Sequence, residues 1–201
     1  AWIDGLDIPF AYYTESQFFE FGRDAIDAVE KQTPARSRSE RLWSHPGLRP
    51  VAHVERPAAT PLLAYRWADT DRALAEQLAL EAEGCTATLS PGHAAVRFTN
   101  PTNGCDALPT MRAEMHRLRG GAASRTRREV GSSVFQVFDG SGSASVGDHR
   151  WTVARGDLFV VPSWQPFSIR ADGAADGPTL DLFRFSDAPI FEALHAQRAQ
   201  D

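Results

Sequence analysis

Cysteine is scarce in this 201-residue sequence, and this limits the kinds of protein it can be. Cys85 and Cys105 are the only two, and no CxxC pair exists, so neither a disulfide framework nor a thiolate zinc site is expected. One disulfide between them stays open at this point, but so few cysteines favour free, buried thiols. We therefore expect a protein of the reducing cytoplasm.

Long apolar runs are absent as well. No stretch approaches 18 apolar residues, so we expect no membrane span. The first residues lack the basic, apolar and small-residue order of a secretory signal peptide. They also lack an initiating Met and begin inside what reads as a strand, so we expect a fragment of a longer protein.

Lysine is nearly missing, since Lys31 is the single example. The formal net charge of −5 argues against nucleic acid or an anionic membrane as the partner. The arginine-rich stretch 36–41 departs from this acidic balance, and we expect it to be a solvated or salt-bridged surface rather than a basic arm.

Closely spaced histidines are the last absence. The six histidines are scattered, and none forms an HxH pair of the kind that supplies two ligands to a metal. They are His45, His53, His93, His116, His149 and His195.

The composition that remains is that of a globular chain, with 42% hydrophobic and 10% aromatic residues. Residues 1–10 alternate, which predicts a strand whose one face carries Trp2, Leu6 and Ile8. Asp4 shares this apolar face. A carboxylate in such a place is either a structural hydrogen-bond anchor or a functional group, and the sequence leaves both interpretations open.

Helical patterns precede and follow a long β region. One helix is expected to start at Thr14, and residues 31–62 read as a long connection without periodicity. Another helix is expected over residues 67–84, capped by Asp69 or Thr70 and ended by Gly84. A last helix begins after residue 186.

Between these helices, short apolar runs alternate with turn signals every 8–12 residues or so, as in an antiparallel sandwich or barrel. The expected strands lie within residues 86–98, 135–147, 149–162 and 167–185.

At this point the chain resembles a cupin, a small double-sheet jelly roll. Its turn residues follow the two cupin motifs, with glycines at 121, 140 and 156 and Pro162 in the second motif. The four positions where cupins carry metal ligands, called here the ligand positions, do not match. They hold Arg127, Glu129, Ser133 and Phe167.

These four side chains cannot form a metal site. Zinc or iron needs three or four nitrogen or oxygen donors, and Glu129 alone is a good one. We therefore expect residues 86–186 to bind no metal. Alternation places Arg127 and Glu129 on one face, and we favour an internal ion pair over an Arg127 that grips a carboxylate ligand.

The resemblance goes beyond the cupin fold to one particular family. The chain resembles the C-terminal portion of the gentisate 1,2-dioxygenase family, which includes salicylate and 1-hydroxy-2-naphthoate dioxygenases. The segments that carry this run through nearly the whole chain: "WIDGLDIPF", "GLRPV", "TPLLAYRWADTDRAL", "VRFTNPTNGCDALPTM", "GDLFVVPSW" and "FRFSDAPIFEAL".

The resemblance implies a mainly β protein with flanking helices that is half of a bicupin. Residues 1–12 would be the last strand of the N-terminal catalytic cupin, 13–85 a helical connection, 86–186 a C-terminal barrel without metal ligands, and 187–201 a C-terminal helix. The Fe(II) of the intact enzyme would be bound by N-terminal histidines that this chain lacks.

The implied activity is O₂-dependent cleavage of gentisate to maleylpyruvate by a cytoplasmic homotetramer. Asp4 would be the catalytic acid–base or hydrogen-bonding group near a ring hydroxyl, and Leu6, Ile8 and Phe19 would line the substrate pocket. The alternatives are a salicylate or 1-hydroxy-2-naphthoate dioxygenase, and a non-catalytic cupin that serves as a structural or oligomerising module.

Overall fold

The computed structural model describes residues 3–16, 35–45, 47–52 and 56–201. Its helices are α1 (Ile8–Tyr13), α2 (Arg38–Leu42), α3 (Trp67–Ala82) and α4 (Ala188–Ala193). Its strands are β1 (His93–Arg97), β2 (Arg112–Leu118), β3 (Arg128–Glu129), β4 (Ser133–Asp139), β5 (Ser141–Val146), β6 (His149–Ala154), β7 (Leu158–Val161), β8 (Phe167–Ala171), β9 (Leu180–Ser186) and β10 (Ala199–Gln200).

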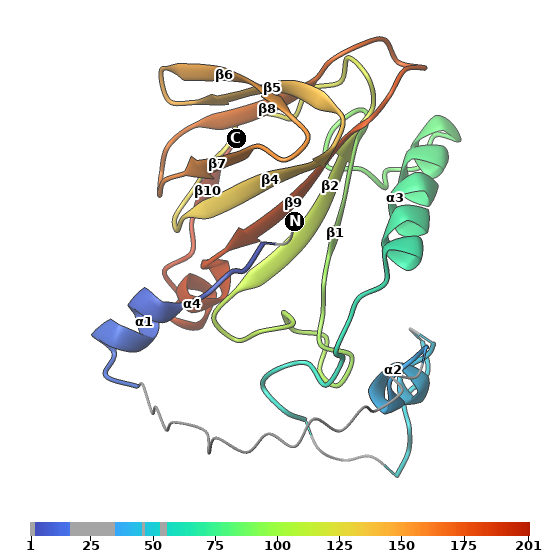
Figure 1. Cartoon of the computed structure of the whole chain (residues 1–201), viewed down its shortest axis with the longest axis vertical. Helices are drawn as coiled ribbons and strands as arrows, with labels where there is room; N and C mark the ends of the chain where they lie inside the picture. The colour runs from blue at the N-terminus through green and yellow to red at the C-terminus, as the bar shows by residue number, and fades with distance from the viewer. Residues whose placement is uncertain (1–2, 17–34, 46, 53–55) are drawn as a thin grey trace, which may run out of the picture.

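Most of these strands form two sheets that face each other (Figure 1). One has the order β1-β2-β9-β4-β7 and the other the order β6-β5-β8, and all neighbours within them are antiparallel. The short pair β10-β3 and bridges such as Arg127 to Phe167 lie outside these two sheets. The expected mainly β jelly roll with flanking helices is confirmed, although the sheets do not close into a continuous barrel.

The tight turns of this jelly roll depend on glycine. Gly121, Gly140 and Gly156, which stand at the motif positions, have φ angles of 75°, 85° and 96°, which side chains rarely adopt. Gly140 joins β4 to β5, and a Cβ there would lie 2.1 Å from the carbonyl oxygen of Thr179. No other residue fits this turn without moving the chain.

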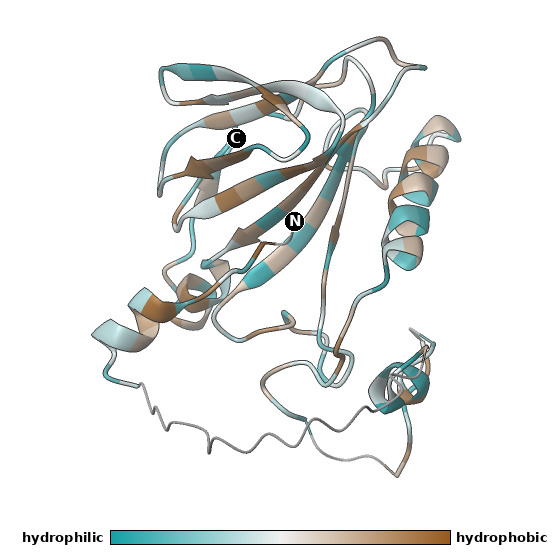
Figure 2. Cartoon of the chain, viewed as in Figure 1, coloured by the Kyte–Doolittle hydropathy of each residue, from teal (hydrophilic) through white to brown (hydrophobic). Residues whose placement is uncertain are grey.

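The main apolar core lies between the two sheets. Side chains alternate along the strands, so every second residue points inward, and the burial pattern of β4 follows this period. Figure 2 shows that β2 and β4 each carry both hydrophobic and hydrophilic residues. The core's most deeply buried members come from β2, β4, β5 and β9. They include Phe135, Val137, Leu180 and Leu182.

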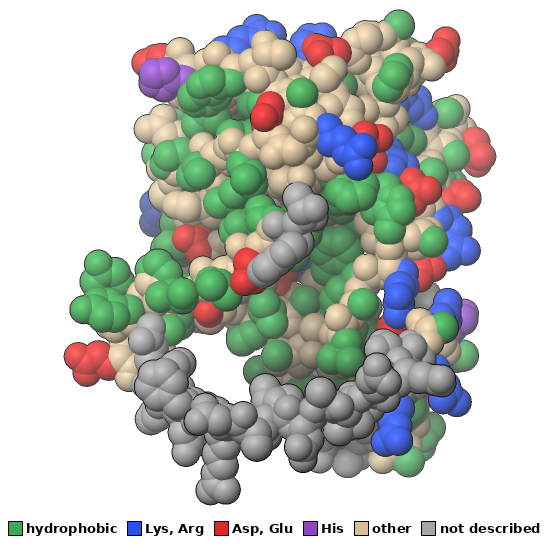
Figure 3. Space-filling model, in the orientation of Figure 1, with side chains coloured by type: hydrophobic (Ala, Val, Ile, Leu, Met, Phe, Trp, Pro, Cys, Tyr) green, Lys and Arg blue, Asp and Glu red, His purple; other side chains and the backbone are tan. Residues whose placement is uncertain are grey.

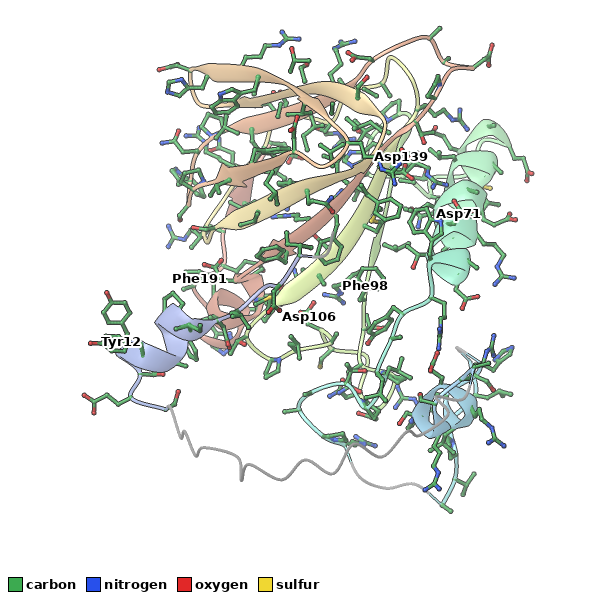
Figure 4. The ribbon with its side chains drawn as sticks, in the orientation of Figure 1. Tyr12, Asp71, Phe98, Asp106, Asp139 and Phe191 are labelled. Carbon is green, nitrogen blue, oxygen red and sulfur yellow. The ribbon has the colours of Figure 1, made fainter. Side chains whose placement is uncertain are left out.

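A second, smaller core lies on the outer side of the five-stranded sheet, where α3 packs (Figure 1). Leu74 and Leu78 of α3 meet Ala94 of β1 and Met115 of β2. An ion pair ties the same elements together, because Arg117 of β2 contacts Asp71 of α3 at 2.7 Å and Asp181 of β9 at 2.6 Å. Figure 4 labels Asp71 on the side of α3 that faces the sheet.

The helix expected over residues 67–84 is confirmed as α3, but the predicted cap is wrong. The helix begins at Trp67, and Arg66 is its N-cap, with an extended backbone and no side-chain capping bond. Thr70 instead donates its hydroxyl proton to the carbonyl of Arg66, and Asp69 pairs with Arg72, so neither is free to cap. The predicted end is confirmed, since Gly84 follows the helix with φ of 90°.

The N-terminal strand prediction is wrong for the described residues. Residues 3–7 form no strand, and α1 begins at Ile8. Pro9 explains the difference, because its fixed φ and missing N–H suit the first turn of a helix. Thr14 therefore ends a helix instead of starting one, and its N–H bonds to the carbonyl of Phe10. The rest of the helix expected to start at Thr14 lies outside the described residues.

Three smaller expectations also change. The strand β2 was not predicted from the sequence. Residues 86–92 form no strand, and their only pairing is the bridge between Ser90 and His93. Cys85 and Cys105 are free as expected, but they are exposed instead of buried because each lies in a connection outside the helices and strands.

Leu74→Ala should destabilise the protein by roughly 2–5 kcal/mol, because Leu74 has no exposed surface and its loss leaves a cavity between α3 and the sheet. Urea unfolding followed by circular dichroism measures this change. Leu80→Ala is the matched control in the same helix, since Leu80 is 40% exposed, and it should cost less than about 0.5 kcal/mol. Equal effects of the two changes would mean that α3 does not pack as described.

Candidate functional site

One end of the space between the sheets is polar, although the rest of it is apolar. On β2 the inward-facing residues run Arg112, Glu114, His116 and Leu118, and the neighbouring β9 runs Ser186, Arg184, Leu182 and Leu180 in the matching register. The first two pairs are therefore polar on both strands, His116 stands opposite a leucine, and the last pair is apolar on both. This register gathers charged side chains at one end of the jelly roll.

A cavity of about 200 Å³ opens at this polar end. Its walls mix charged groups with the inward-facing rings of β4 and β8. The lining residues include His93, Arg112, Glu114, His116, Arg127, Glu129, Phe135, Phe167, Arg184 and Ser186.

Arg184 of β9 is the central group of this cavity. Its guanidinium donates to Glu114 at 3.0 Å, to Glu129 at 2.7 Å, and to the hydroxyl of Ser133 at 3.0 and 2.7 Å. The same group lies 5.4 Å from the ring centroid of Phe135. Arg184 is only 8% exposed, so this shell of acceptors and π surface replaces the water it loses.

The predicted ion pair between Arg127 and Glu129 is confirmed. Arg127 Nε lies 2.7 Å from Glu129 Oε1, while the other carboxylate oxygen of Glu129 accepts from Arg184. Glu129 therefore serves two arginines at once. Arg127 is the outer partner, since 43% of its side chain is exposed.

Sequence reasoning missed a second group in the cavity, formed by His93 and His116. His93 Nε2 lies 3.0 Å from His116 Nδ1, and His116 Nε2 lies 3.5 Å from Glu114 Oε2. The two histidines are 23 positions apart in the sequence, yet β1 and β2 are neighbours and bring the rings together. The alternation of Arg112, Glu114 and His116 on one strand face was the signal that could have indicated this group.

Burial controls the charge of this group. Burial, together with the nearby His116, lowers the pKa of His93 from 6.5 to about 3, so His93 is neutral at pH 7. For Glu114, burial alone would raise the pKa, but His116 and the charge of Arg184 outweigh it and lower the pKa to about 2. Glu114 is therefore a carboxylate that balances Arg184.

The cavity does not offer the donors of an iron site, and the family resemblance places the iron on N-terminal histidines outside this chain. Its ligand positions hold an ion pair, a hydroxyl already bonded to Arg184, and the ring of Phe167. Within the part of the chain that the structure describes, no three His, Cys, Asp or Glu side chains form a group able to bind a metal ion. The residues present here therefore do not form an iron centre.

The structure does not bring the predicted substrate residues into this cavity. Asp4 is exposed, and Leu6 and Ile8 are 61% and 56% exposed on the molecular surface. Ile8 belongs to α1, so it does not continue the strand face of Leu6. Phe19 lies outside the described residues.

The segment around Asp4 is anchored next to β2. Asp7 accepts a hydrogen bond from the hydroxyl of Thr110, just before β2 begins. Gly5 faces Met111 and Phe185, since a Cβ added there would lie 3.4 Å from the Met111 sulfur. Asp4 is thus presented at the surface, at the end of the sheet that also carries the polar cavity.

No protein-family model matches the chain. Among curated proteins it is 54% identical to gentisate 1,2-dioxygenase of Streptomyces sp over 98% of this chain and 53% of that protein. It is 30% identical to 5-aminosalicylate 1,2-dioxygenase of Comamonas sp over 100% of this chain and 50% of that protein. The chain spans about half the length of the curated relatives it matches.

The comparison with solved structures also finds aromatic-acid dioxygenases. A mutant of the salicylate 1,2-dioxygenase of Pseudoaminobacter salicylatoxidans, in complex with gentisate, superposes with a TM-score of 0.89 at 52% identity. The match covers 96% of this chain and 52% of that one. The chain is therefore a half-length homologue of these dioxygenases, and its fold is the cupin fold that the sequence predicted.

The pKa of His93 predicts an acid-sensitive fold. Between about pH 6.5 and 3 the unfolded chain binds a proton at His93 that the folded chain does not, so stability falls as the pH falls. When the pH falls from 7 to 5, the protonation of His93 in the unfolded chain should lower the free energy of unfolding by about 2 kcal/mol. Urea unfolding at both pH values measures the loss.

His93→Gln should remove that part of the pH dependence while it keeps a polar group in the cavity. His149→Gln is the matched control, because His149 is exposed on β6, and it should leave the pH dependence unchanged. A His93→Gln variant as acid-sensitive as the original chain would refute the assignment.

Proposed function

We propose that this chain forms part of a non-haem Fe(II) dioxygenase that opens the aromatic ring of gentisate with O₂ to give maleylpyruvate. The observation that supports this most is the 54% identity to a gentisate 1,2-dioxygenase over 98% of the chain. Only half of that protein is matched, so the proposal concerns a longer polypeptide of which these residues are one portion.

The iron is proposed to lie outside this chain, bound by histidines of an N-terminal cupin. The reason is chemical, since the four ligand positions of the described barrel carry Arg127, Glu129, Ser133 and Phe167. We assign residues 1–12 to the edge of the catalytic cupin, 13–85 to the connection, 86–186 to the second barrel and 187–201 to a C-terminal helical segment.

Asp4 is proposed as the group of this chain that acts on the substrate. An exposed carboxylate next to apolar side chains can accept a hydrogen bond or a proton from a ring hydroxyl once another surface covers it. Leu6 and Ile8, and Phe19 beyond the described residues, are proposed to line the same pocket against the aromatic ring.

The surface around Asp4 supports this assignment. Apolar side chains gather on and around α1 (Figure 3), where Ile8, Tyr12 and Tyr13 are 56%, 66% and 83% exposed. Tyr12 projects from α1 away from the two sheets (Figure 4). Exposed apolar patches of this kind mark interaction sites, and we propose that the catalytic cupin covers this one.

The substrate class is proposed from the relatives' own names. The matched proteins are gentisate, 5-aminosalicylate, salicylate and 1-hydroxy-2-naphthoate dioxygenases, and all these names describe aromatic hydroxy-acids. Salicylate or 1-hydroxy-2-naphthoate is therefore the alternative substrate. The protein is further proposed to be cytoplasmic and to assemble as a homotetramer.

A non-catalytic structural cupin is the alternative of a different class, and the polar cavity without metal ligands favours it for the second barrel alone. A measurement of O₂ consumption distinguishes the dioxygenase from the structural module. The longer polypeptide, loaded with Fe(II), should consume O₂ when gentisate is added, whereas the 201-residue chain with Fe(II) should not. An iron-loaded longer polypeptide without O₂ consumption on any of these hydroxy-acids would favour the structural module.

Asp4→Asn in the longer polypeptide should lower kcat roughly 10²-fold, which is typical for the loss of a positioned proton acceptor. Oxygen-electrode kinetics with gentisate measures kcat, and thermal unfolding checks that the fold is intact. Asp148→Asn is the control, since Asp148 is an exposed turn residue between β5 and β6. Unchanged kinetics of Asp4→Asn would reduce Asp4 to a surface residue.

A further inference from the structure

Three of the four ligand positions contact one and the same guanidinium, that of Arg184. Glu129 accepts from it at 2.7 Å, and Ser133 accepts from its Nε at 3.0 Å and from its Nη2 at 2.7 Å. The ring of Phe167 lies 5.9 Å from its central carbon. The cupin motif brings these positions together around a metal, and here they surround a cation of the protein itself.

Two further groups complete the shell around Arg184. Glu114 of β2 accepts from Nη1 at 3.0 Å, and the ring of Phe135 of β4 lies 5.4 Å away. The fourth ligand position, Arg127, pairs with the other oxygen of Glu129. Two carboxylates, one hydroxyl and two rings thus surround a charge that is 8% exposed.

We propose that the guanidinium of Arg184 occupies the metal position of this barrel and takes the place of the metal as its central cation. The barrel then contains a permanent positive charge that no chelator removes, because arginine stays protonated at every accessible pH. This proposal does not depend on the proposed dioxygenase activity, since it concerns the second barrel alone.

The proposal makes the barrel a latent cation site. If the guanidinium is removed, Glu114 loses its cation, and Glu129 keeps only its outer partner Arg127. His116 adds a third donor, because its Nε2 is buried without a hydrogen-bond partner among the described residues and lies 3.5 Å from Glu114 Oε2. With Arg184 in place these three side chains do not form a metal-binding group. Two carboxylates and one imidazole are nevertheless donor types that suit Zn²⁺ or Mn²⁺, and removal of the guanidinium gives them room to converge.

Arg184→Ala in the 201-residue chain tests this directly. The variant should bind one Zn²⁺ or Mn²⁺ per chain in calorimetric titration, at least tenfold more tightly than the original chain does. The same metal, added in stoichiometric amount, should raise the melting temperature of the variant and leave that of the original chain unchanged. Guanidinium chloride at low, non-denaturing concentration should also raise the variant's melting temperature, since it restores the missing group.

Arg117→Ala is the matched control. Arg117 is likewise a buried arginine held by two carboxylates, those of Asp71 and Asp181, but it lies on the outer face of the sheet, away from the ligand positions. This variant should gain no comparable metal affinity. If it gains as much as Arg184→Ala, any pair of unmasked carboxylates suffices and the proposal fails.

The remaining outcomes also decide the proposal. If guanidinium but neither metal raises the melting temperature of Arg184→Ala, Arg184 is an ordinary member of a buried ion pair, and the proposal is overturned. Failure of both additions would overturn it as well. If the variant is unfolded alone, folding on addition of Zn²⁺ or Mn²⁺ supports the proposal, and continued unfolding contradicts it.

Discussion

The burial of one arginine charge organises the polar half of this molecule. Arg184 comes from the central strand β9, and its partners Glu114, Glu129 and Ser133 come from β2, β3 and β4. A buried charge without compensation costs several kcal/mol, so these strands are held in the one register that brings the acceptors to the guanidinium. In that register Ser186 of β9 stands opposite Ser133 of β4.

The polar cluster and the apolar core share the same two sheets without mixing. Register places Leu182 next to His116 and Val137, so the chain passes from charged to fully apolar within one pair of residues along β9. At this boundary the burial of His93, together with His116, lowers the pKa of His93. Outside the sheet, α3 and the ion pair of Arg117 hold β1 and β2 in place. The segment proposed to act on the substrate lies at the surface of this jelly roll.

The barrel and its lost ligand positions could be predicted, because glycine turns and alternation are local signals. The pairing of Arg127 with Glu129 is local too, since the two residues are on one strand face. Arg184 and the pair His93–His116 were missed because their partners are distant in sequence. A lone arginine in "LFRFS" indicates only that it needs a partner. Glu129 lies 55 positions away in the sequence, so the sequence does not show which residue that partner is.

The sequence by itself determined the fold class, the family resemblance and the lack of a full set of metal donors at the ligand positions, because these depend on residue type and spacing along the chain. The tertiary structure decided the rest. It turned residues 8–13 into a helix in place of a strand, since Pro9 suits a first helical turn and no neighbouring strand pairs with this segment among the described residues. It also chose the cation at the centre of the barrel, because that choice depends on which distant carboxylates the strand register brings within hydrogen-bond distance of one guanidinium.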